Sequence, residues 1–236
     1  MSNVRLFFSD HLSINFCSKL NKSQSHYLNK VMRVKENQNF SLFNEKGEWE
    51  AKINNISKGI VEFQISKQLR QKENLKEIWL AFSPIKSNYF NFMIQKSTEL
   101  GTSKFIPIIT DRTIVRKINS KRIEKVIIES CEQSNRLKIP SLEKPISLEN
   151  FIKKSEKMNI IFCDLNTNNK ALNINILKNN NPTCILIGPE GDFTEGERKK
   201  ILKLNNIQSM KINENILRSE TAAISAISIV SYNLNL

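Results

Sequence analysis

The stretch Ile185-Leu-Ile-Gly-Pro-Glu-Gly-Asp-Phe-Thr194 indicates a strand, a loop with two glycines and the start of a helix. Residues 184–187 form a short apolar run that stops at Gly188, as is typical of a buried strand. Thr194 stands three residues before Glu197, which is the spacing of a capping box, so a polar helix is expected to follow. A strand that breaks at glycine before a helix is where open α/β sheets bind ligands.

The charges of this loop restrict its ligand. It carries Glu190 and Asp192 and has no lysine. A loop that cradles phosphates supplies backbone N–H groups and usually a cation, whereas carboxylates repel an anion. We therefore expect a ligand that is not held by phosphates, such as a ribose, an adenine edge or a cationic group.

A second stretch, Asn215-Ile-Leu-Arg-Ser-Glu-Thr-Ala-Ala223, precedes a helix expected over residues 220–232. If the strands before the two stretches are neighbours, this helix presents Arg218, Glu220 and nearby hydroxyls beside the first loop. Its many Ala and Ser residues allow close approach to a ligand, although an ordinary core helix has the same composition. The two stretches together predict a site.

The chain is strongly basic. Its 236 residues include 36 Lys and Arg against 23 Asp and Glu, a net charge of +13. This balance favours a polyanionic partner, with RNA or DNA as the first candidate. A proteome rich in Asn and Lys would decorate the surface in the same way, so charge alone leaves both interpretations open.

Several classes are disfavoured by composition. No apolar run is long enough for a membrane span, and the N-terminus lacks the apolar region of a secretory signal. The four cysteines are scattered, without a Cys-x-x-Cys pair, and only two histidines are present, so we expect no metal site. We expect a cytoplasmic protein whose cysteines are small buried side chains.

The chain changes character at about residue 70. Before it, residues 39–43, 49–53 and 60–65 are short alternating runs that predict a β-rich unit, with a short helix over 26–33. Residues 67–76 are polar and charged, as in a linker. From residue 77 strands and helices alternate, which predicts a mostly parallel sheet covered on both faces. The expected strands are 78–82, 105–109, 160–163, 184–187 and 209–212, the expected helices 88–100, 122–131, 194–203 and 220–232, and 166–181 is expected to be loop or ragged helix.

Four blocks of the chain resemble the RsmE family of SPOUT-class RNA methyltransferases. They are Phe92-Met-Ile-Gln-Lys-Ser-Thr-Glu-Leu-Gly101, Glu129-Ser-Cys-Glu-Gln-Ser-Asn-Arg136, Leu186-Ile-Gly-Pro-Glu-Gly191 and Ile216-Leu-Arg-Ser-Glu-Thr-Ala222. Arg5-Leu-Phe-Phe8 and His26-Tyr-Leu-Asn-Lys-Val-Met-Arg33 are similar to the family's opening, so the resemblance spans essentially the whole chain.

The resemblance implies an α/β protein of two domains: an N-terminal PUA-like β-barrel that binds RNA, over 1–70, and a C-terminal SPOUT-type α/β domain with a trefoil knot, over 75–236. It implies a homodimer that uses S-adenosyl-L-methionine to methylate N3 of a uridine in 16S ribosomal RNA, the uracil(1498) site. The small ribosomal subunit is then the partner, without a membrane or a metal. A catalytically degenerate RNA-binding protein of the same fold is the alternative.

The resemblance also implies site residues. Those expected to line the cofactor are Ile187, Gly188, Glu190, Gly191, Ile212, Ile216, Leu217, Arg218, Thr221 and Ala222. We expect Arg218 to stabilise the developing uracil anion. Glu220, or as the second candidate Glu190, is expected to accept the proton, unless Arg218 and Glu220 form a structural ion pair. In addition, Arg5, Lys30 and Arg33 of the basic β-rich unit are expected to bind RNA phosphates. Arg136 is expected to contact RNA or the partner subunit, unless it is only a solvent-exposed helix residue.

The chain departs from the family pattern at four places. Asp192 and Asn135 each stand where the family usually has glycine, and Ile212-Asn-Glu-Asn215 where it often has Leu-Gly-x-Arg. Lys86-Ser-Asn88 replaces a Lys-Gly-Asp-like helix start. Asn tolerates a left-handed backbone better than most residues, so Asn135 and Asn213 are expected to keep the family conformation. Asp192 is expected to alter the loop or its RNA contact.

Overall fold

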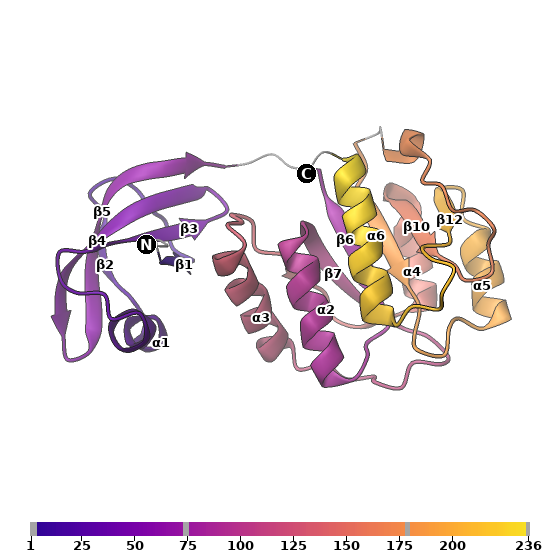
Figure 1. The fold of residues 1–236 in the computed structure, drawn as a ribbon, viewed down its shortest axis with the longest axis horizontal. Helices are drawn as coiled ribbons and strands as arrows, with labels where there is room; N and C mark the ends of the chain where they lie inside the picture. The colour runs from indigo at the N-terminus through magenta and orange to yellow at the C-terminus, as the bar shows by residue number, and fades with distance from the viewer. Residues whose placement is uncertain (1–3, 73–75, 178–179, 235–236) are drawn as a thin grey trace. The chain divides into compact units, whose positions relative to one another are not determined.

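The computed structural model describes residues 4–72, 76–177 and 180–234, which fall into two compact units (Figure 1). The first unit consists of residues 1–74 and 131–139, and the second consists of residues 75–130 and 140–236. The expected domains, 1–70 and 75–236, did not assign residues 131–139 to the first unit.

The first unit is built on a five-stranded sheet of order β1-β3-β4-β5-β2, in which β1 is parallel to β3 and the other pairs are antiparallel. Its strands are β1 (Arg5–Phe7), β2 (Cys17–Lys19), β3 (Asn39–Asn44), β4 (Gly47–Ser57) and β5 (Ile60–Gln71). The three predicted strands of this unit are therefore confirmed, and two short ones were missed. Gly47 is required at the β3–β4 turn, because a Cβ there would collide with the Arg70 carbonyl oxygen.

The prediction of a linker over 67–76 was wrong for its first half. Residues 67–71 continue β5 and pair with β4. Most of their side chains are exposed, so no alternation of apolar residues marks the strand. Lys67 and Arg70 instead pair with the β4 carboxylates Glu50 and Glu48.

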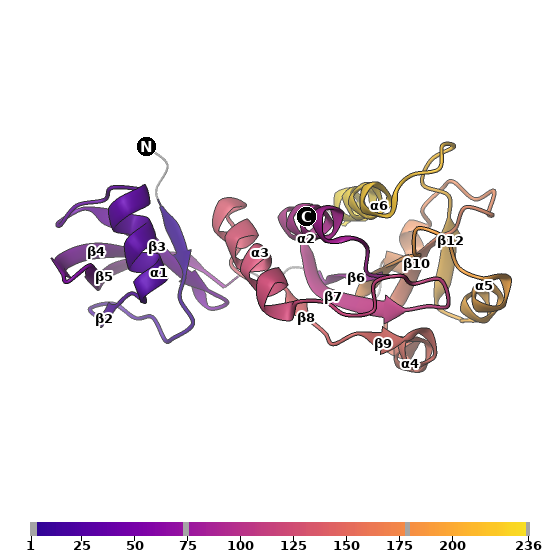
Figure 2. The ribbon, with the colours of Figure 1, turned by 90° about the horizontal axis from the view of Figure 1, so that it is seen from below.

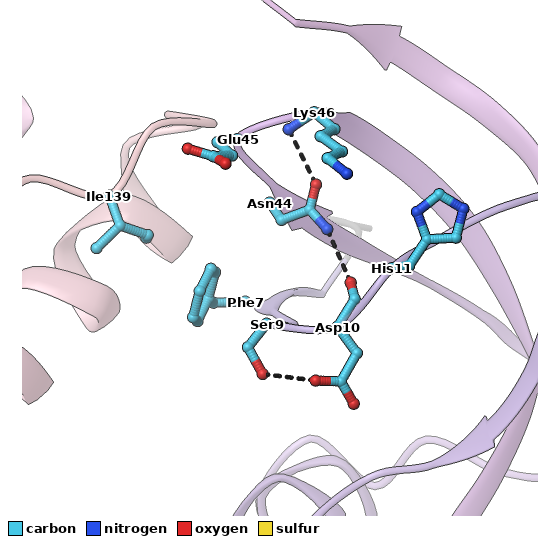
Figure 3. Close-up of a pocket in the computed structure, with 8 residues that line it drawn as sticks. All are labelled: Phe7, Ser9, Asp10, His11, Asn44, Glu45, Lys46 and Ile139. Atoms are coloured by element: carbon cyan, nitrogen blue, oxygen red, sulfur yellow. Dashed lines mark hydrogen bonds between the residues drawn. The ribbon is translucent and has the colours of Figure 1, made fainter.

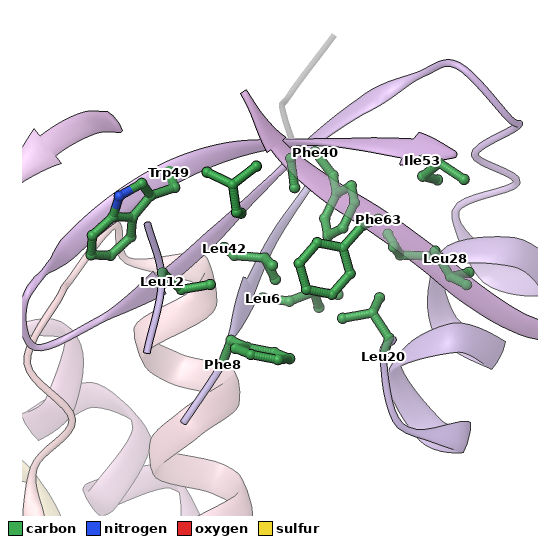
Figure 4. Close-up of a cluster of buried hydrophobic side chains, with 13 residues drawn as sticks. Leu6, Phe8, Leu12, Leu20, Leu28, Phe40, Leu42, Trp49, Ile53 and Phe63 are labelled. Atoms are coloured by element: carbon green, nitrogen blue, oxygen red, sulfur yellow. The ribbon is translucent and has the colours of Figure 1, made fainter. Parts of the chain in front are cut away.

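One apolar cluster forms the core of the first unit, and the unit's helix packs against it (Figure 4). This helix is α1 (Lys22–His26), which continues as a π-helical turn, η1 (Tyr27–Val31). It begins earlier than the predicted 26–33, because the Asn21 side chain accepts from Gln24 N and caps it. Buried members of the cluster include Leu6, Phe8, Leu20, Leu28, Phe40 and Phe63.

The second unit contains a parallel sheet of order β12-β10-β11-β6-β7-β8, with β9 paired to β7. This confirms the predicted sheet. Its strands are β6 (Ile78–Phe82), β7 (Thr102–Ile109), β8 (Ser141–Leu142), β9 (Ile146–Ser147), β10 (Asn159–Cys163), β11 (Thr183–Ile187) and β12 (Ile207–Met210). The last begins and ends two residues before the predicted 209–212. Pro107 is tolerated in β7 because it falls between the residues that pair with β8 and those that pair with β9.

Helices cover both faces of this sheet, with α2 and α6 on one face and α4 and α5 on the other (Figure 2). The helices are α2 (Ser87–Glu99), α3 (Ser120–Gln133), α4 (Leu148–Lys154), α5 (Glu195–Leu202) and α6 (Ser219–Asn233), with short 3₁₀ turns η2 (Ser155–Lys157) and η3 (Ile174–Leu177). All four predicted helices of this unit are present, and α4 was missed. The predicted loop over 166–181 contains η3, and its residues 178–179 lie outside the described residues.

The cysteines follow the prediction in part. Cys131 and Cys184 are buried, and burial raises the pKa of the Cys131 thiol to about 11 and that of Cys163 to about 12. Cys17 is exposed, contrary to expectation, because it lies on the short strand β2. Within the described residues, no helix is long and apolar enough to cross a membrane, and no cluster of side chains could hold a metal ion.

Candidate functional site

The loop after β11 forms one wall of the candidate site. Strand β11 is buried throughout, and the chain turns directly after it, with Asp192 N donating to the Pro189 carbonyl oxygen at 2.9 Å. Gly188 is required here, since a Cβ would lie 2.8 Å from the Phe193 ring. The loop therefore brings its backbone close to the strand end, where parallel sheets bind ligands.

Asp192 has a left-handed backbone, with φ of +59°. Its Oδ1 accepts from the N–H of Phe193 at 2.7 Å, which stabilises the turn locally. Glycine adopts this conformation without strain, and Asp is among the residues that tolerate it best. The expectation that Asp192 alters the loop is thus not supported, because it adopts a conformation that suits glycine.

Two other departures are explained in similar terms. Asn135 has φ of +62°, so it takes the left-handed conformation expected of it. Asn213 is not among the described residues with positive φ. Its side-chain oxygen instead accepts from Asn215 N at 2.9 Å, a local turn that holds the second stretch.

The second wall is the segment that leads into α6. Strands β11 and β12 are not neighbours, because β10 lies between them. The chain after β12 nevertheless returns to the first loop, where Ser219 Oγ donates to the Gly188 carbonyl oxygen at 3.3 Å. Helix α6 packs against β11, β6 and α2. The two stretches therefore meet, although not through adjacent strands.

Arg218 occupies the N-cap position of α6 and is exposed. Its guanidinium carbon lies 5.3 Å from the centroid of the Tyr89 ring on α2, within the range of a cation–π contact. Interaction with the Tyr89 side chain, and then with the carboxylates of Glu220 and Glu190, raises the pKa of Arg218 above its usual value. The site thus holds a fixed positive charge.

Glu220 is 9% exposed and lies in the first turn of α6. The helix N-terminus favours a negative charge at this place. Among the residues that the structure describes, Arg218 and Glu220 form no close ion pair, although the Glu220 carboxylate contributes to the raised pKa of Arg218. Glu190, from the opposite loop, is exposed.

The remaining predicted cofactor residues lie on these two walls with different exposure. Ile187 is buried at the end of β11, and Gly191 is exposed in the loop. Ile216 is 84% exposed, which is unusual for a large apolar side chain on an ordered segment. Ile212, Leu217 and Ala222 are half-buried, and Thr221 is exposed. An apolar surface flanked by carboxylates and backbone groups fits an uncharged or cationic ligand better than a phosphate.

A third loop, after β7, braces the first wall. Arg112 Nη1 donates to the Gly191 carbonyl oxygen at 2.7 Å. Glu197 is 7% exposed, and its Oε1 accepts from Asp111 N at 2.8 Å while its Oε2 accepts from Thr194 N at 2.9 Å. The predicted capping box is confirmed, and its carboxylate also links two loops. Sequence reasoning missed Arg112 and Tyr89, because neither belongs to a motif near the site.

The predicted RNA contacts of the first unit fall into two groups. Lys30 and Arg33 are exposed, and Arg33 has a left-handed backbone, with φ of +54°. Arg5 is buried against protein: its Nε pairs with Glu48, and its other nitrogens donate to the carbonyl oxygens of Cys131, Glu132 and Arg136. Because these partners occupy the guanidinium of Arg5, the expectation that it binds RNA phosphates is not supported. The half-buried side chain of Arg136 has partners within the protein.

Comparison with known proteins gives the context of this geometry. A family model described as an RNA methyltransferase domain matches residues 71–231, and one described as an RNA methyltransferase PUA domain matches 20–66. The ribosomal RNA small subunit methyltransferase E of Rickettsia conorii is 34% identical over 96% of this chain and 94% of its own. That of Buchnera aphidicola from Schizaphis graminum is 32% identical over 94% and 93%.

The comparison with solved structures leads to similar proteins. The ribosomal RNA small subunit methyltransferase E of Neisseria gonorrhoeae, solved with S-adenosyl methionine bound, has a TM-score of 0.86 and 28% identity. The match covers 98% of this chain and 97% of that one. A methyltransferase structure from Legionella pneumophila has a TM-score of 0.87 at 24% identity, which supports the fold.

Proposed function

The chain belongs to the RNA methyltransferase family whose members include ribosomal RNA small subunit methyltransferase E, and we propose that it methylates N3 of a uridine in 16S ribosomal RNA. The target nucleotide is the one that the family name implies, uracil(1498). The observation that carries the proposal is the meeting of the Gly188–Asp192 loop with the Arg218–Ala222 turn, joined by Ser219 Oγ and the Gly188 carbonyl oxygen.

The cofactor is S-adenosyl-L-methionine, which supplies a methyl group on a sulfonium cation. Glu190 and Asp192 are compatible with such a cation, and neither would suit a phosphate. The loop residues Ile187, Gly188 and Gly191 form one side of its site. Ile212, Ile216, Leu217, Thr221 and Ala222 form the other side.

Methylation of uracil N3 requires removal of the N3 proton. Bound S-adenosyl-L-methionine would supply the methyl group, and its sulfonium would leave as a neutral thioether. Glu220 accepts this proton, and Arg218 stabilises the negative charge that develops on the uracil carbonyl oxygens. The contact with Tyr89 supports this role, since it places the guanidinium beside the start of α6. Alignment of the two reactants by rigid walls contributes roughly 7–11 kcal/mol in favourable cases.

The C-terminal chain is threaded as a trefoil knot, and the sheet of the first unit is a PUA-like barrel. The strand order supports the knot, because the segment from β12 to α6 has to pass the end of β10 to reach Gly188. The working protein is a cytoplasmic homodimer that acts on the small ribosomal subunit, with Lys30 and Arg33 as RNA contacts. Arg136 also faces the RNA in this proposal.

Arg218→Ala tests the chemistry. We expect a loss of methylation of about 100-fold or more, the scale found when a charge-stabilising donor is removed, with an unchanged thermal melt. Arg116→Ala, which removes an exposed arginine elsewhere in the second unit, should leave the rate unchanged. Full turnover by Arg218→Ala would remove this residue from the mechanism.

Calorimetry with S-adenosyl-L-methionine separates an enzyme from a degenerate RNA-binding protein. The proposal predicts saturable binding by the wild-type protein, weakened by Gly188→Ala because the added Cβ collides with Phe193. A protein that binds RNA but not the cofactor would instead be the degenerate alternative.

A further inference from the structure

The first unit contains a pocket of about 290 Å³ (Figure 3). Its apolar side is formed by Phe7 and Ile139. Its polar rim comes from the chain that follows β1 and from the turn between β3 and β4. The polar residues are Ser9, Asp10, His11, Asn44, Glu45 and Lys46. Phe7 belongs to the opening block Arg5-Leu-Phe-Phe8, which has no role in the proposed methyl-transfer site.

Hydrogen bonds hold the aromatic side of this pocket. Phe7 N donates to Glu132 Oε1 at 2.9 Å, and its carbonyl oxygen accepts from Gln24 Nε2 at 2.7 Å. Glu132 lies in the segment that returns to the first unit, as does Ile139. The Phe7 backbone is thus fixed from two sides, so its ring is presented in a defined place.

The rim is held in the same way. Asn44 is 6% exposed, and its Nδ2 donates to the Asp10 carbonyl oxygen at 3.0 Å while its Oδ1 accepts from Lys46 N at 3.0 Å. Ser9 Oγ donates to Asp10 Oδ1 at 3.1 Å. The two rim segments are therefore tied together before any ligand arrives, which lowers the cost of binding.

The chemistry of the pocket restricts its occupant. Two carboxylates, Asp10 and Glu45, stand at the rim and disfavour a phosphate inside. An aromatic ring beside them suits a flat group that stacks, and carboxylates accept hydrogen bonds from exocyclic amino groups such as cytosine N4. Lys46 supplies a cation for the phosphate that flanks a bound base. The volume is close to the lower limit for small-ligand sites, which suits one base rather than a helix.

We propose that this pocket binds one unpaired, amino-bearing nucleobase of the RNA, with its ring on Phe7 and its amino group donating to Asp10 or Glu45. The inference rests on the proposed function in that it takes RNA as the substrate. It adds a base-reading position in the first unit to the phosphate contacts of Lys30 and Arg33.

The test is fluorescence anisotropy with labelled oligocytidylate and oligouridylate of equal length, since the two carry the same phosphates and differ at the 4-amino group. The wild-type protein should bind oligocytidylate more tightly. The double variant Asp10→Asn/Glu45→Gln should lose this preference. The matched control Glu124→Gln/Glu156→Gln, which neutralises two exposed carboxylates of the second unit, should retain it.

Phe7→Leu keeps an apolar side chain and removes the stacking ring, so it should weaken both oligonucleotides about tenfold with the same salt dependence. Equal affinity of the wild-type protein for the two oligonucleotides, or an unchanged preference in the double variant, would overturn the proposal. Methylation of small ribosomal subunits is measured on the same preparations. Methylation without a base preference in the wild-type protein rejects the pocket alone, whereas a base preference without methylation rejects the proposed function alone.

Discussion

Asp192 maintains the backbone conformation of a loop in which the family usually has glycine. Its left-handed backbone is unfavourable for most side chains, and its carboxylate adds a hydrogen bond to Phe193 N. The hydrogen bond of the carboxylate therefore stabilises a backbone conformation that glycine would adopt without strain. The loop retains its path, and the negative charge does not conflict with a sulfonium cofactor.

Substitutions at Asp192 test this explanation. Asp192→Gly should change the free energy of unfolding by less than about 0.5 kcal/mol, because relief of strain offsets the lost bond. Asp192→Ala should cost about 1–2 kcal/mol, since it loses the bond and keeps the strain. Urea unfolding measures both, and Asn135→Gly should resemble Asp192→Gly. An alanine variant as stable as the glycine variant would contradict the explanation.

At the scale of elements, the site depends on three loops rather than two. Arg112, after β7, holds the Gly191 carbonyl oxygen, and Glu197 ties the same loop to the start of α5. Arg112 is a positioning residue in this view. It fixes the wall against which the cofactor lies.

Arg112→Ala should raise the Kd and the KM for S-adenosyl-L-methionine about tenfold, because a charge-assisted hydrogen bond contributes about 1.5–3 kcal/mol. The kcat at saturating cofactor should change little. Calorimetry and steady-state kinetics measure these effects, with Arg116→Ala as the control in the same loop. A reduced kcat with unchanged cofactor affinity would argue against the brace.

Elements marked by buried periodic side chains could be predicted from the sequence. Strand β11 and the capped helix α5 are examples, because the apolar run and the Thr194–Glu197 spacing are local signals. The second half of β5 could not be predicted, since its exposed polar side chains resemble a linker. Helix α4 was missed because it is only seven residues long.

The candidate site could be predicted only where a motif carried it. The Gly188 loop and the Arg218 turn were recognised from their residues, and the structure brings them together. Tyr89 and Arg112 could not be found in this way, because they reach the site through the packing of α2 and the loop after β7. Arg5 was misjudged for the converse reason: its backbone acceptors lie more than a hundred residues away in the chain.

At the scale of the whole molecule, the second unit exposes large apolar side chains on and beside α2 and α6. Tyr89 is 45% exposed, Phe92 47%, Ile216 84% and Tyr232 82%. Such side chains on adjacent helices mark an interaction surface, and a two-fold axis would bury the same surface of both subunits. This surface supports the proposed homodimer.

If the protein is the proposed homodimer, Phe92→Glu/Tyr232→Glu should convert it to a monomer of 27.3 kDa in light scattering and reduce methylation strongly. Ile14→Glu is the matched control, because Ile14 is 60% exposed in the first unit. Dimers that persist in the double variant would place the interface on another surface.

Mapping of the transferred methyl group tests both the substrate, 16S ribosomal RNA, and the methylated atom, uracil N3. The protein is incubated with labelled S-adenosyl-L-methionine and small ribosomal subunits that lack the modification, and the labelled nucleotide is then identified. The account predicts one methyl group on N3 of a single uridine in 16S ribosomal RNA, the uracil(1498) site. No transfer under these conditions, or transfer to a different base, would contradict it.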